Sequence, residues 1–136
     1  MILIYVDTNI FLDAIKNRTN LFGKNIGKKA SKIFVESISC KFYIAVSTWT
    51  LHELRKQIQP EHVKMLFTMM RKKIKIVKHD ESDIEKANNR SNNHYDDALH
   101  IVLAEKCSAD IIITRNTDHF NEVGTDIPVK KPEQLV

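Results

Sequence analysis

Cysteine and long hydrophobic runs are both scarce in this sequence. The two cysteines, Cys40 and Cys107, form no CxxC motif, which argues against a redox pair and against a zinc knot. We expect both thiols to be packing residues in a reducing compartment. No apolar run approaches the ~20 residues of a membrane span, and the N-terminus lacks the basic region of a signal peptide. These absences predict a cytoplasmic protein without a membrane partner.

The chain is also short and lacks internal repeats and low-complexity tracts. Its 136 residues, 43% of them hydrophobic and 28% charged, suit one globular core, so we expect a single domain over residues 1–136. The net charge is +4, from 21 basic and 17 acidic residues. Two basic clusters are either phosphate contacts or solvated helix faces. They comprise Lys24, Lys28, Lys29 and Lys32, and Arg71, Lys72, Lys73, Lys75 and Lys78.

Apolar strands alternate with amphipathic helices along the chain. Strands are expected at residues 2–6, 42–46, 74–77 and 111–114, with a weaker fifth at 127–130. After the first strand we expect a short helix that carries Ile10 and Ile15, and then a loop around Gly23 and Gly27. A helix is expected over Ala30–Ser39, and another follows an N-cap at Ser47. Three more helices are expected: one that begins at Pro60, one that begins with a capping box of Ser82 and Glu85, and one that begins near Tyr95. This order predicts an α/β fold in which helices flank a mostly parallel central sheet of four to five strands.

Acidic residues follow the strands at positions that should meet in space. Asp7 ends the first strand, Glu53 lies early in the helix after the second, and Asp118 follows the fourth. Asp97 begins the helix that runs antiparallel to the fourth strand, so its end of that helix lies near the same sheet edge. We therefore expect these four acids to converge where open α/β sheets bind ligands.

Helical phase separates the neighbouring acids Asp96 and Asp97. Asp97 is in line with Ile101, on the side that should pack on the sheet, whereas Asp96 aligns with His100. Each acid also has an ordinary explanation when taken alone. Asp7 and Asp97 could stabilise helix N-termini, and Glu53 could pair with a neighbour on its own helix. Their joint placement is what favours chemistry.

Converging carboxylates repel one another unless a cation lies between them. Oxygen ligands suit Mg²⁺ or Mn²⁺, and His52-Glu53 is not part of a zinc-binding HExxH motif because Lys56 occupies the second histidine position. One or two such ions would activate water and stabilise charge on a phosphodiester. The acids thus predict metal-dependent phosphodiester hydrolysis.

The chain resembles the PIN-domain nucleases, and among them the VapC-type toxins of toxin–antitoxin pairs. The resemblance covers nearly the whole chain and is carried by YVDTNIFLD, VSTWTLHEL and YDDALHIVLAEKCSADIIITRNTDHF. It implies a PIN-like three-layer fold, endoribonuclease activity with Mg²⁺ or Mn²⁺, an RNA substrate, an antitoxin whose tail occupies the acidic cleft, and a homodimer. By motif position Asp7, Glu53 and Asp97 match the family's acids, and Asn9 the polar residue that supports the first.

The fourth acidic position departs from the commonest pattern of that family. Asn116 stands where many relatives have an acid, so Asp118 is expected to take the role, and Thr114 to position a ligand or water. An alternative is a catalytically weak or inactive PIN-like module that binds RNA or protein. A phosphotransferase of the haloacid-dehalogenase kind fits less well, because Asn9 replaces its second aspartate.

Several further residues have a structural interpretation. Asp110 is expected in a turn at the opposite edge of the sheet, and Asp13 on the surface with a minor possibility of contact near Asp7. Trp49 is expected to pack rather than to stack on a base. His100 and His119 are expected to be hydrogen-bonded structural residues rather than substrate contacts.

Overall fold

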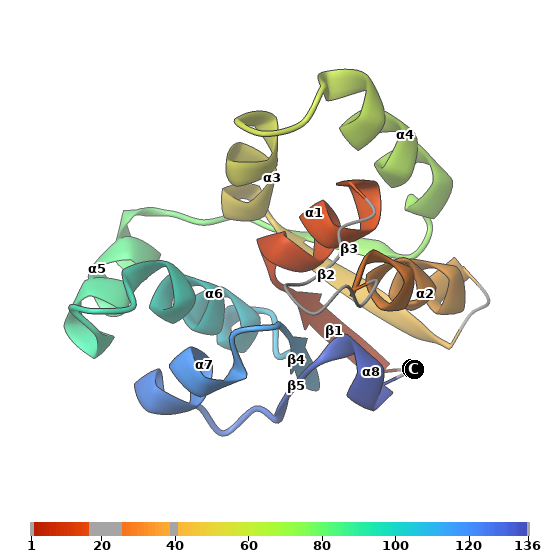
Figure 1. Ribbon diagram of the computed structural model, residues 1–136. Helices are drawn as coiled ribbons and strands as arrows, with labels where there is room; N and C mark the ends of the chain where they lie inside the picture. The colour runs from red at the N-terminus through yellow and green to blue at the C-terminus, as the bar shows by residue number, and fades with distance from the viewer. Residues whose placement is uncertain (1, 17–25, 39–40, 136) are drawn as a thin grey trace.

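The computed structural model describes residues 2–16, 26–38 and 41–135 (Figure 1). Cys40, Lys24 and Gly23 therefore lie outside the described residues. The strands are β1 (Ile2–Val6), β2 (Phe42–Ser47), β3 (Ile74–Val77), β4 (Ile111–Ile113) and β5 (Val129–Lys130). The helices are α1 (Thr8–Lys16), α2 (Ile26–Ile38), α3 (Thr48–Arg55), α4 (Pro60–Met70), α5 (Glu81–Arg90), α6 (Tyr95–Lys106), α7 (Thr117–Val123) and α8 (Pro132–Leu135).

The five strands form one sheet in which every pairing is parallel, in the order β3-β2-β1-β4-β5. This confirms the predicted α/β fold and its mostly parallel sheet. The central strand β1 is buried on both faces because its side chains alternate between two cores. Ile4 and Val6 belong to one core, whereas Tyr5 belongs to the other.

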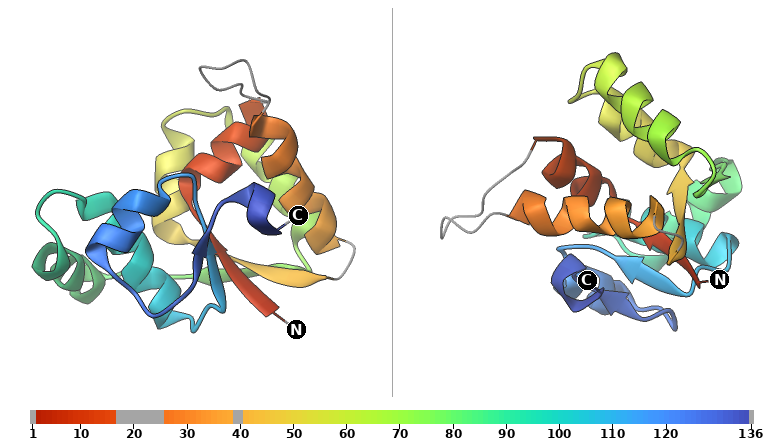
Figure 2. Two further views of the ribbon diagram at one scale, coloured as in Figure 1. Left: turned by 60° about the horizontal axis from the view of Figure 1, so that its bottom comes forward. Right: turned by 90° about the vertical axis from the view of Figure 1, so that its right-hand side faces the viewer.

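Helices cover both faces of the sheet, which gives three layers (Figures 1 and 2). Helices α1 to α4 pack on the face of Ile4 and Val6, and their apolar side chains complete that core. Helices α5, α6 and α7 pack on the face of Tyr5, where α6 supplies an almost continuous apolar run from Ala98 to Ala104. None of the helices in the described part of the chain is both long and apolar enough to cross a membrane.

The strand order reverses direction beside β1. The chain moves from β1 to β2 and β3 on one side, then returns to place β4 and β5 on the other. Such a reversal leaves a crevice at the carboxyl ends of the two strands that flank it. Here those strands are β1 and β4, and the residues that follow them are Asp7 and Thr114.

Two helix starts differ from the sequence expectation. Helix α2 begins at Ile26, so Gly27 lies inside a helix and not in a loop. The capping box of α5 consists of Asp80 and Asp83 rather than Ser82 and Glu85. The expectation was wrong by two residues because Asp80 is also a strong N-cap residue with an acid three positions later, and local spacing does not choose between the two pairs.

The expectations for Ser47, Asp110 and Cys107 agree with the structure, whereas two short helices were not expected. Ser47 is the N-cap of α3 and accepts a hydrogen bond from the Thr50 backbone N–H (3.0 Å). Asp110 accepts one from the Leu3 backbone N–H (2.8 Å), at the end of the sheet opposite Asp7. Cys107 is a buried free thiol. The short helices α7 and α8 were not expected, because neither carries a full apolar period.

Candidate functional site

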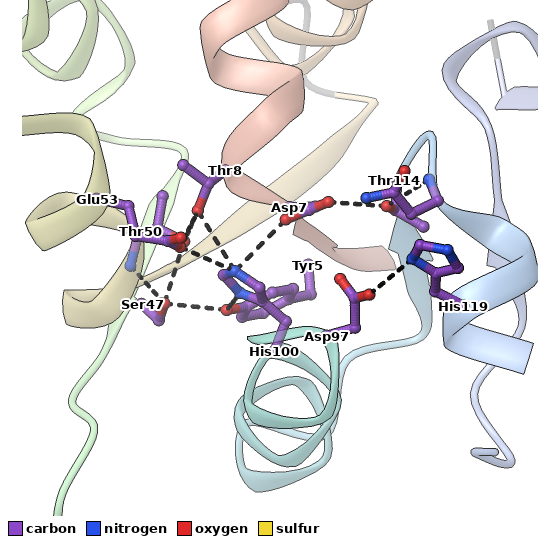
Figure 3. Close-up of polar contacts among 11 residues, drawn as sticks. Tyr5, Asp7, Thr8, Ser47, Thr50, Glu53, Asp97, His100, Thr114 and His119 are labelled. Atoms are coloured by element: carbon purple, nitrogen blue, oxygen red, sulfur yellow. Dashed lines mark hydrogen bonds and ion pairs between the residues drawn. The ribbon is translucent and has the colours of Figure 1, made fainter. Parts of the chain in front are cut away.

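Asp7 lies at the reversal point and is almost completely buried, with 3% of its surface exposed. Thr114, at the end of β4, donates a hydrogen bond from Oγ1 to Asp7 Oδ2 (2.8 Å; Figure 3). The Asp7 backbone N–H donates to the carbonyl of Ile113 (3.0 Å). Burial raises the pKa of Asp7, although the charge of His100 and the Thr114 hydrogen bond act in the opposite direction. The chain thus holds a carboxylate where water is largely excluded.

Glu53 reaches the same edge from α3, whose orientation is set by the Ser47 cap. Its Oε1 accepts a hydrogen bond from Thr8 Oγ1 (2.6 Å) and lies 3.1 Å from Nε2 of His100. Burial acts to raise the pKa of Glu53, but its hydrogen bonds with His100 and Thr8 and the charge of His100 lower it overall. Glu53 is therefore held as an anion by contacts from α1 and α6.

His100 is the site residue whose position sequence analysis missed. Its ring is only 2% exposed, and Nε2 lies 3.1 Å from Glu53 Oε1 and 3.4 Å from Asp7 Oδ1 (Figure 3). Its Nδ1 lies 2.7 Å from the Tyr5 hydroxyl, which itself donates to Ser47 Oγ (2.9 Å). Since the Tyr5 hydroxyl donates to Ser47, the Tyr5 oxygen can accept a hydrogen bond from the Nδ1–H of His100.

This environment favours an imidazolium at His100. Burial opposes protonation, but the Tyr5 oxygen, the hydrogen bond to Glu53 and the charges of Asp7 and Glu53 raise the pKa of His100 well above its usual value. The expectation of a hydrogen-bonded histidine is correct. Its partners are the site acids themselves, and the only sequence signal was one polar residue within the apolar run of α6.

The two acids at the start of α6 both lie at the site. Asp97 is inward as expected, with 14% of its side chain exposed, and its pKa is raised by burial and by the nearby charge of Asp7. Asp96 is more exposed but does not point away, because its carboxyl hydrogen-bonds to Glu53. Burial, and then the charge of Glu53, raise the pKa of Asp96. Asp96 is thus a further acid of this site, which helical phase alone had set aside.

The remaining predicted site residues lie at its margin. Asp118 is exposed in the first turn of α7, and Asn9 is exposed in the first turn of α1. Asn116 is the N-cap residue of α7, and its backbone N–H donates to Thr114 Oγ1 (3.0 Å). Within the described ranges, no hydrogen bond or ion pair joins the Asp118 or Asn9 side chain to Asp7, Glu53 or Asp97. Their participation stays a prediction.

Asp13 is not a surface residue, contrary to the main expectation. It is 3% exposed, and Arg115 Nε, just after β4, donates to its Oδ2 (3.3 Å). Arg115 also donates from Nη1 to Glu133 Oε1 of α8 (2.6 Å). Asp13 and Arg115 are 102 positions apart in sequence, so no local pattern predicts their contact. These contacts fasten α1 to the loop after β4, next to the bond between Asp7 and Thr114.

A group of two histidines and one acid lies on the side of the site away from Glu53. His119 Nδ1, from α7, is 3.3 Å from Asp97 Oδ2 (Figure 3). His94, just before α6, stacks on His119 with ring centroids 4.2 Å apart and an interplanar angle of 16°. One ligand atom from each of His94, Asp97 and His119 lies within 4.8 Å of the others, a grouping that could hold a metal ion.

Trp49 packs as expected, whereas the role of the two basic clusters stays open. Trp49 is half-buried and packs against His52 and His79, with ring centroids 5.3 and 5.7 Å away. The exposed residues of the two basic clusters include Lys28, Lys32 and Arg71. Their role in phosphate binding stays a prediction.

Comparison with known proteins settles the family. The family model for the PIN domain matches residues 4–118, which include the end of β1 that leads to Asp7, all of α3 and the acids of α6. This chain belongs to the PIN domain family. Membership confirms the predicted resemblance, and it supports a hydrolase that acts on nucleic acids. It also favours a divalent metal ion, because PIN domains generally use one.

Solved structures share the fold of this PIN domain. FitAcB from Neisseria gonorrhoeae is 16% identical in sequence, with a TM-score of 0.59, and the match covers 96% of this chain and 98% of that one. FitAB bound to an IR36 DNA fragment is 17% identical, with a TM-score of 0.55 and coverage of 95% and 94%. At these identities the likeness extends to the fold alone. No curated protein gives a significant match.

Proposed function

We propose that this PIN domain is a metal-dependent endoribonuclease and the toxin of a toxin–antitoxin pair. The observation that carries the proposal is the meeting of Asp7, Glu53 and Asp97 at the carboxyl edge of the sheet. These acids come from the end of β1, from α3 and from the start of α6. The RNA substrate and the toxin role follow from the sequence resemblance.

The acids suit a hard divalent cation. Burial and a nearby acid raise the pKa of each carboxyl, Glu53 acting on Asp7 and Asp7 acting on Asp97, so positive charge between them would favour their anions. Carboxylate oxygens are the ligands that Mg²⁺ and Mn²⁺ prefer. We assign one or two such ions to Asp7, Glu53 and Asp97, with Asp118 at the margin. When bound, the ion supplies the charge that polarises the phosphodiester and lowers the pKa of water.

The protein's own residues set the geometry of this chemistry. Thr114 orients Asp7 from β4, and Thr8 orients Glu53 from α1. Tyr5 and Ser47 hold His100 so that its Nε2 faces both acids. Asp7 and Glu53 are therefore held in fixed positions before an ion or substrate binds, which lowers the entropy cost of reaching the transition state. Basic side chains at the surface would hold the RNA backbone.

One observation favours a second candidate, a PIN-like module that binds RNA or protein without cleaving it. Nε2 of His100 lies 3.1 Å from Glu53 Oε1 and 3.4 Å from Asp7 Oδ1, and the raised pKa of His100 favours a positive charge there. That charge partly neutralises the acids without a metal ion. The two candidates differ in metal binding, because a nuclease needs the ion and a binding module does not.

The deciding experiment is a cleavage panel. Labelled single-stranded RNA, structured RNA and single-stranded DNA are each incubated with Mg²⁺, Mn²⁺ or EDTA. We expect wild-type protein to cut RNA only with a metal ion, and Asp97→Asn to lose about 10²–10³-fold in rate, as for loss of one charge-stabilising group. Asp126→Asn, at an exposed position after α7, is the matched control and retains the wild-type rate.

Two outcomes would overturn the nuclease assignment. Equal cleavage by Asp97→Asn and wild type would show that the cutting arises elsewhere. Absence of cleavage by folded wild-type protein, across the panel and with saturating Mn²⁺, would favour the binding module.

The toxin role predicts an inhibitory partner and a cytoplasmic homodimer. An antitoxin tail that carries an arginine would suit the acidic cleft, because a guanidinium forms paired hydrogen bonds with carboxylates and replaces the cation's charge. Changing that arginine to alanine in the partner should restore cleavage. Persistent inhibition would indicate that the tail merely blocks the cleft. Sedimentation equilibrium of the protein alone tests the dimer.

A further inference from the structure

The histidine pair beside Asp97 is not used by the chemistry proposed above. His94 and His119 come from two separate segments, the residue before α6 and the first turns of α7, and meet at one carboxylate. We propose that His94, Asp97 and His119 form a second cation site that binds a transition-metal ion such as Zn²⁺ in preference to Mg²⁺. Its placement beside a nuclease centre rests on the proposed function, whereas the binding of the ion does not.

The spacing of the ligand atoms is close to what such an ion needs. The three atoms lie within 4.8 Å of one another, and Zn–N bonds of about 2.0 Å place two ligands of a tetrahedral ion about 3.3 Å apart. His119 can close that difference, because 51% of its side chain is exposed. Binding would also turn the His119 ring out of its stack on His94, so that both lone pairs face the ion.

Glu122 supports the role of His94 as a ligand. Its Oε2 lies 2.9 Å from Nε2 of His94 and, as an acceptor, favours the proton on that nitrogen. The other ring nitrogen of His94 then carries a lone pair. Metal-binding histidines commonly have this arrangement, in which a carboxylate fixes the tautomer through the nitrogen that does not bind the ion.

The ligand types determine which ion is preferred. Imidazole nitrogen suits Zn²⁺ and its transition-metal neighbours, whereas Mg²⁺ is bound mainly by oxygen. Three protein ligands would leave one position open, as in catalytic zinc sites. Asp97 belongs both to this group and to the acid cluster with Asp7, so the second ion would lie next to the first. The pair of sites would then carry different metals.

Co²⁺, whose visible absorption reports its ligands, is a direct probe for this site. Full-length protein is titrated with Co²⁺, and Zn²⁺ is then added as a competitor. We expect saturable binding to wild type, reversed by Zn²⁺ but not by Mg²⁺. His94→Ala and His119→Ala should each weaken Co²⁺ binding more than ~10-fold, and Glu122→Gln by about 10-fold, as is usual for outer partners of a metal site. His62→Ala, at an exposed position of α4, is the matched control.

Equal Co²⁺ affinity in wild type, His94→Ala and His119→Ala would overturn the proposal. Should a variant misfold, Zn²⁺-dependent shifts of the His94 and His119 ring signals in wild-type NMR spectra decide the question, and unchanged signals count against the site. In the Asp7→Asn variant, both proposals together predict lost RNA cleavage and retained Co²⁺ binding. The wild-type protein separates them. Histidine-dependent Co²⁺ binding without any RNA cleavage would overturn only the proposed function, and Mg²⁺-dependent cleavage without such binding would overturn only the second site.

Discussion

At the scale of single residues, the site is a set of charges held by neutral hydrogen-bond donors. Asp7 is buried and would be poorly solvated without Thr114, whose hydroxyl donates to it from the neighbouring strand. Glu53 depends in the same way on Thr8. Threonine hydroxyls suit this role because they orient a carboxylate without neutralising it. Both carboxylates are thus oriented toward a cation or toward His100.

Thr114→Val should destabilise the protein and raise the pKa of Asp7 further, because the buried carboxylate loses its donor while the side-chain shape is kept. A buried acceptor left without its partner costs about 1–3 kcal/mol. Urea unfolding at neutral pH measures the loss, and RNA cleavage should fall in parallel. Thr68→Val, at an exposed position of α4, is the control and should leave the free energy of unfolding almost unchanged. Equal stability of the two variants would contradict the role of Thr114.

At the scale of elements, the residue that caps α3 also belongs to the hydrogen bonds that hold His100 at the site. Ser47 ends β2 and caps α3, and its hydroxyl also accepts a hydrogen bond from the Tyr5 hydroxyl. Tyr5 in turn contacts His100 of α6. The side chains that orient α3 on the sheet are therefore the same ones that hold the imidazole between the acids.

Ser47→Ala should destabilise the protein by about 0.5–2 kcal/mol, the usual cost of losing an N-cap, and should loosen His100 as well. Thermal or urea unfolding gives the first effect, and the His100 ring signals in NMR spectra give the second. Ser82→Ala is an informative control, because the structure places the α5 cap at Asp80 and leaves Ser82 exposed. A larger loss for Ser82→Ala than for Ser47→Ala would contradict both assignments.

At the scale of the whole molecule, polar contacts join the helices on the Tyr5 face of the sheet, α5, α6 and α7, to one another. Arg90 of α5 contacts Glu105 of α6 through Nη1 (2.5 Å) and Nη2 (3.2 Å), and Nη2 also donates to the carbonyl of Gly124 after α7 (2.7 Å). Thr125 donates to the same Glu105 carboxylate (2.8 Å). Arg90 and Glu105 therefore connect α5, α6 and the end of α7 and hold them in place relative to one another.

These contacts predict a pH-dependent contribution to stability from Glu105. Burial acts to raise the pKa of Glu105, but hydrogen bonds from Arg90 and Thr125 lower it overall, from an ordinary value of 4.5. A carboxyl group whose folded-state pKa is lowered stabilises the protein above its unfolded-state pKa, and this contribution is lost as the pH falls through the folded-state value. Wild type should therefore exceed Glu105→Gln in stability at neutral pH. The difference should shrink below about pH 4.5.

Urea unfolding of both proteins over a pH series measures this difference. The partly exposed position of Glu105 makes the effect modest and sensitive to salt. A difference that stayed constant from neutral to acidic pH would show that the substitution acts through packing and not through charge.

Much of the fold and part of the site follow from patterns that are local in sequence. The strands around Ile4, Ile44 and Ile112 are apolar runs of the right length, and the helices between them have a clear apolar stripe. The end of each strand is visible as a change to polar residues. The positions of Asp7, Glu53 and Asp97 relative to those strand ends are therefore enough to assign all three acids to one edge of the sheet.

The sequence by itself determined the alternation of strands and helices, because that depends on neighbours within a few positions. The parallel sheet and the gathering of acids at one edge follow from this alternation, because crossovers between parallel strands have a fixed hand. Only the tertiary structure decided which distant side chains meet at those acids and around them. His100 reaches Asp7 and Glu53, Arg115 reaches Asp13, and His94 meets His119, in each case across the chain. The physical reason is that such contacts depend on how α3, α6 and α7 are placed on the sheet, and packing of the whole core sets that placement.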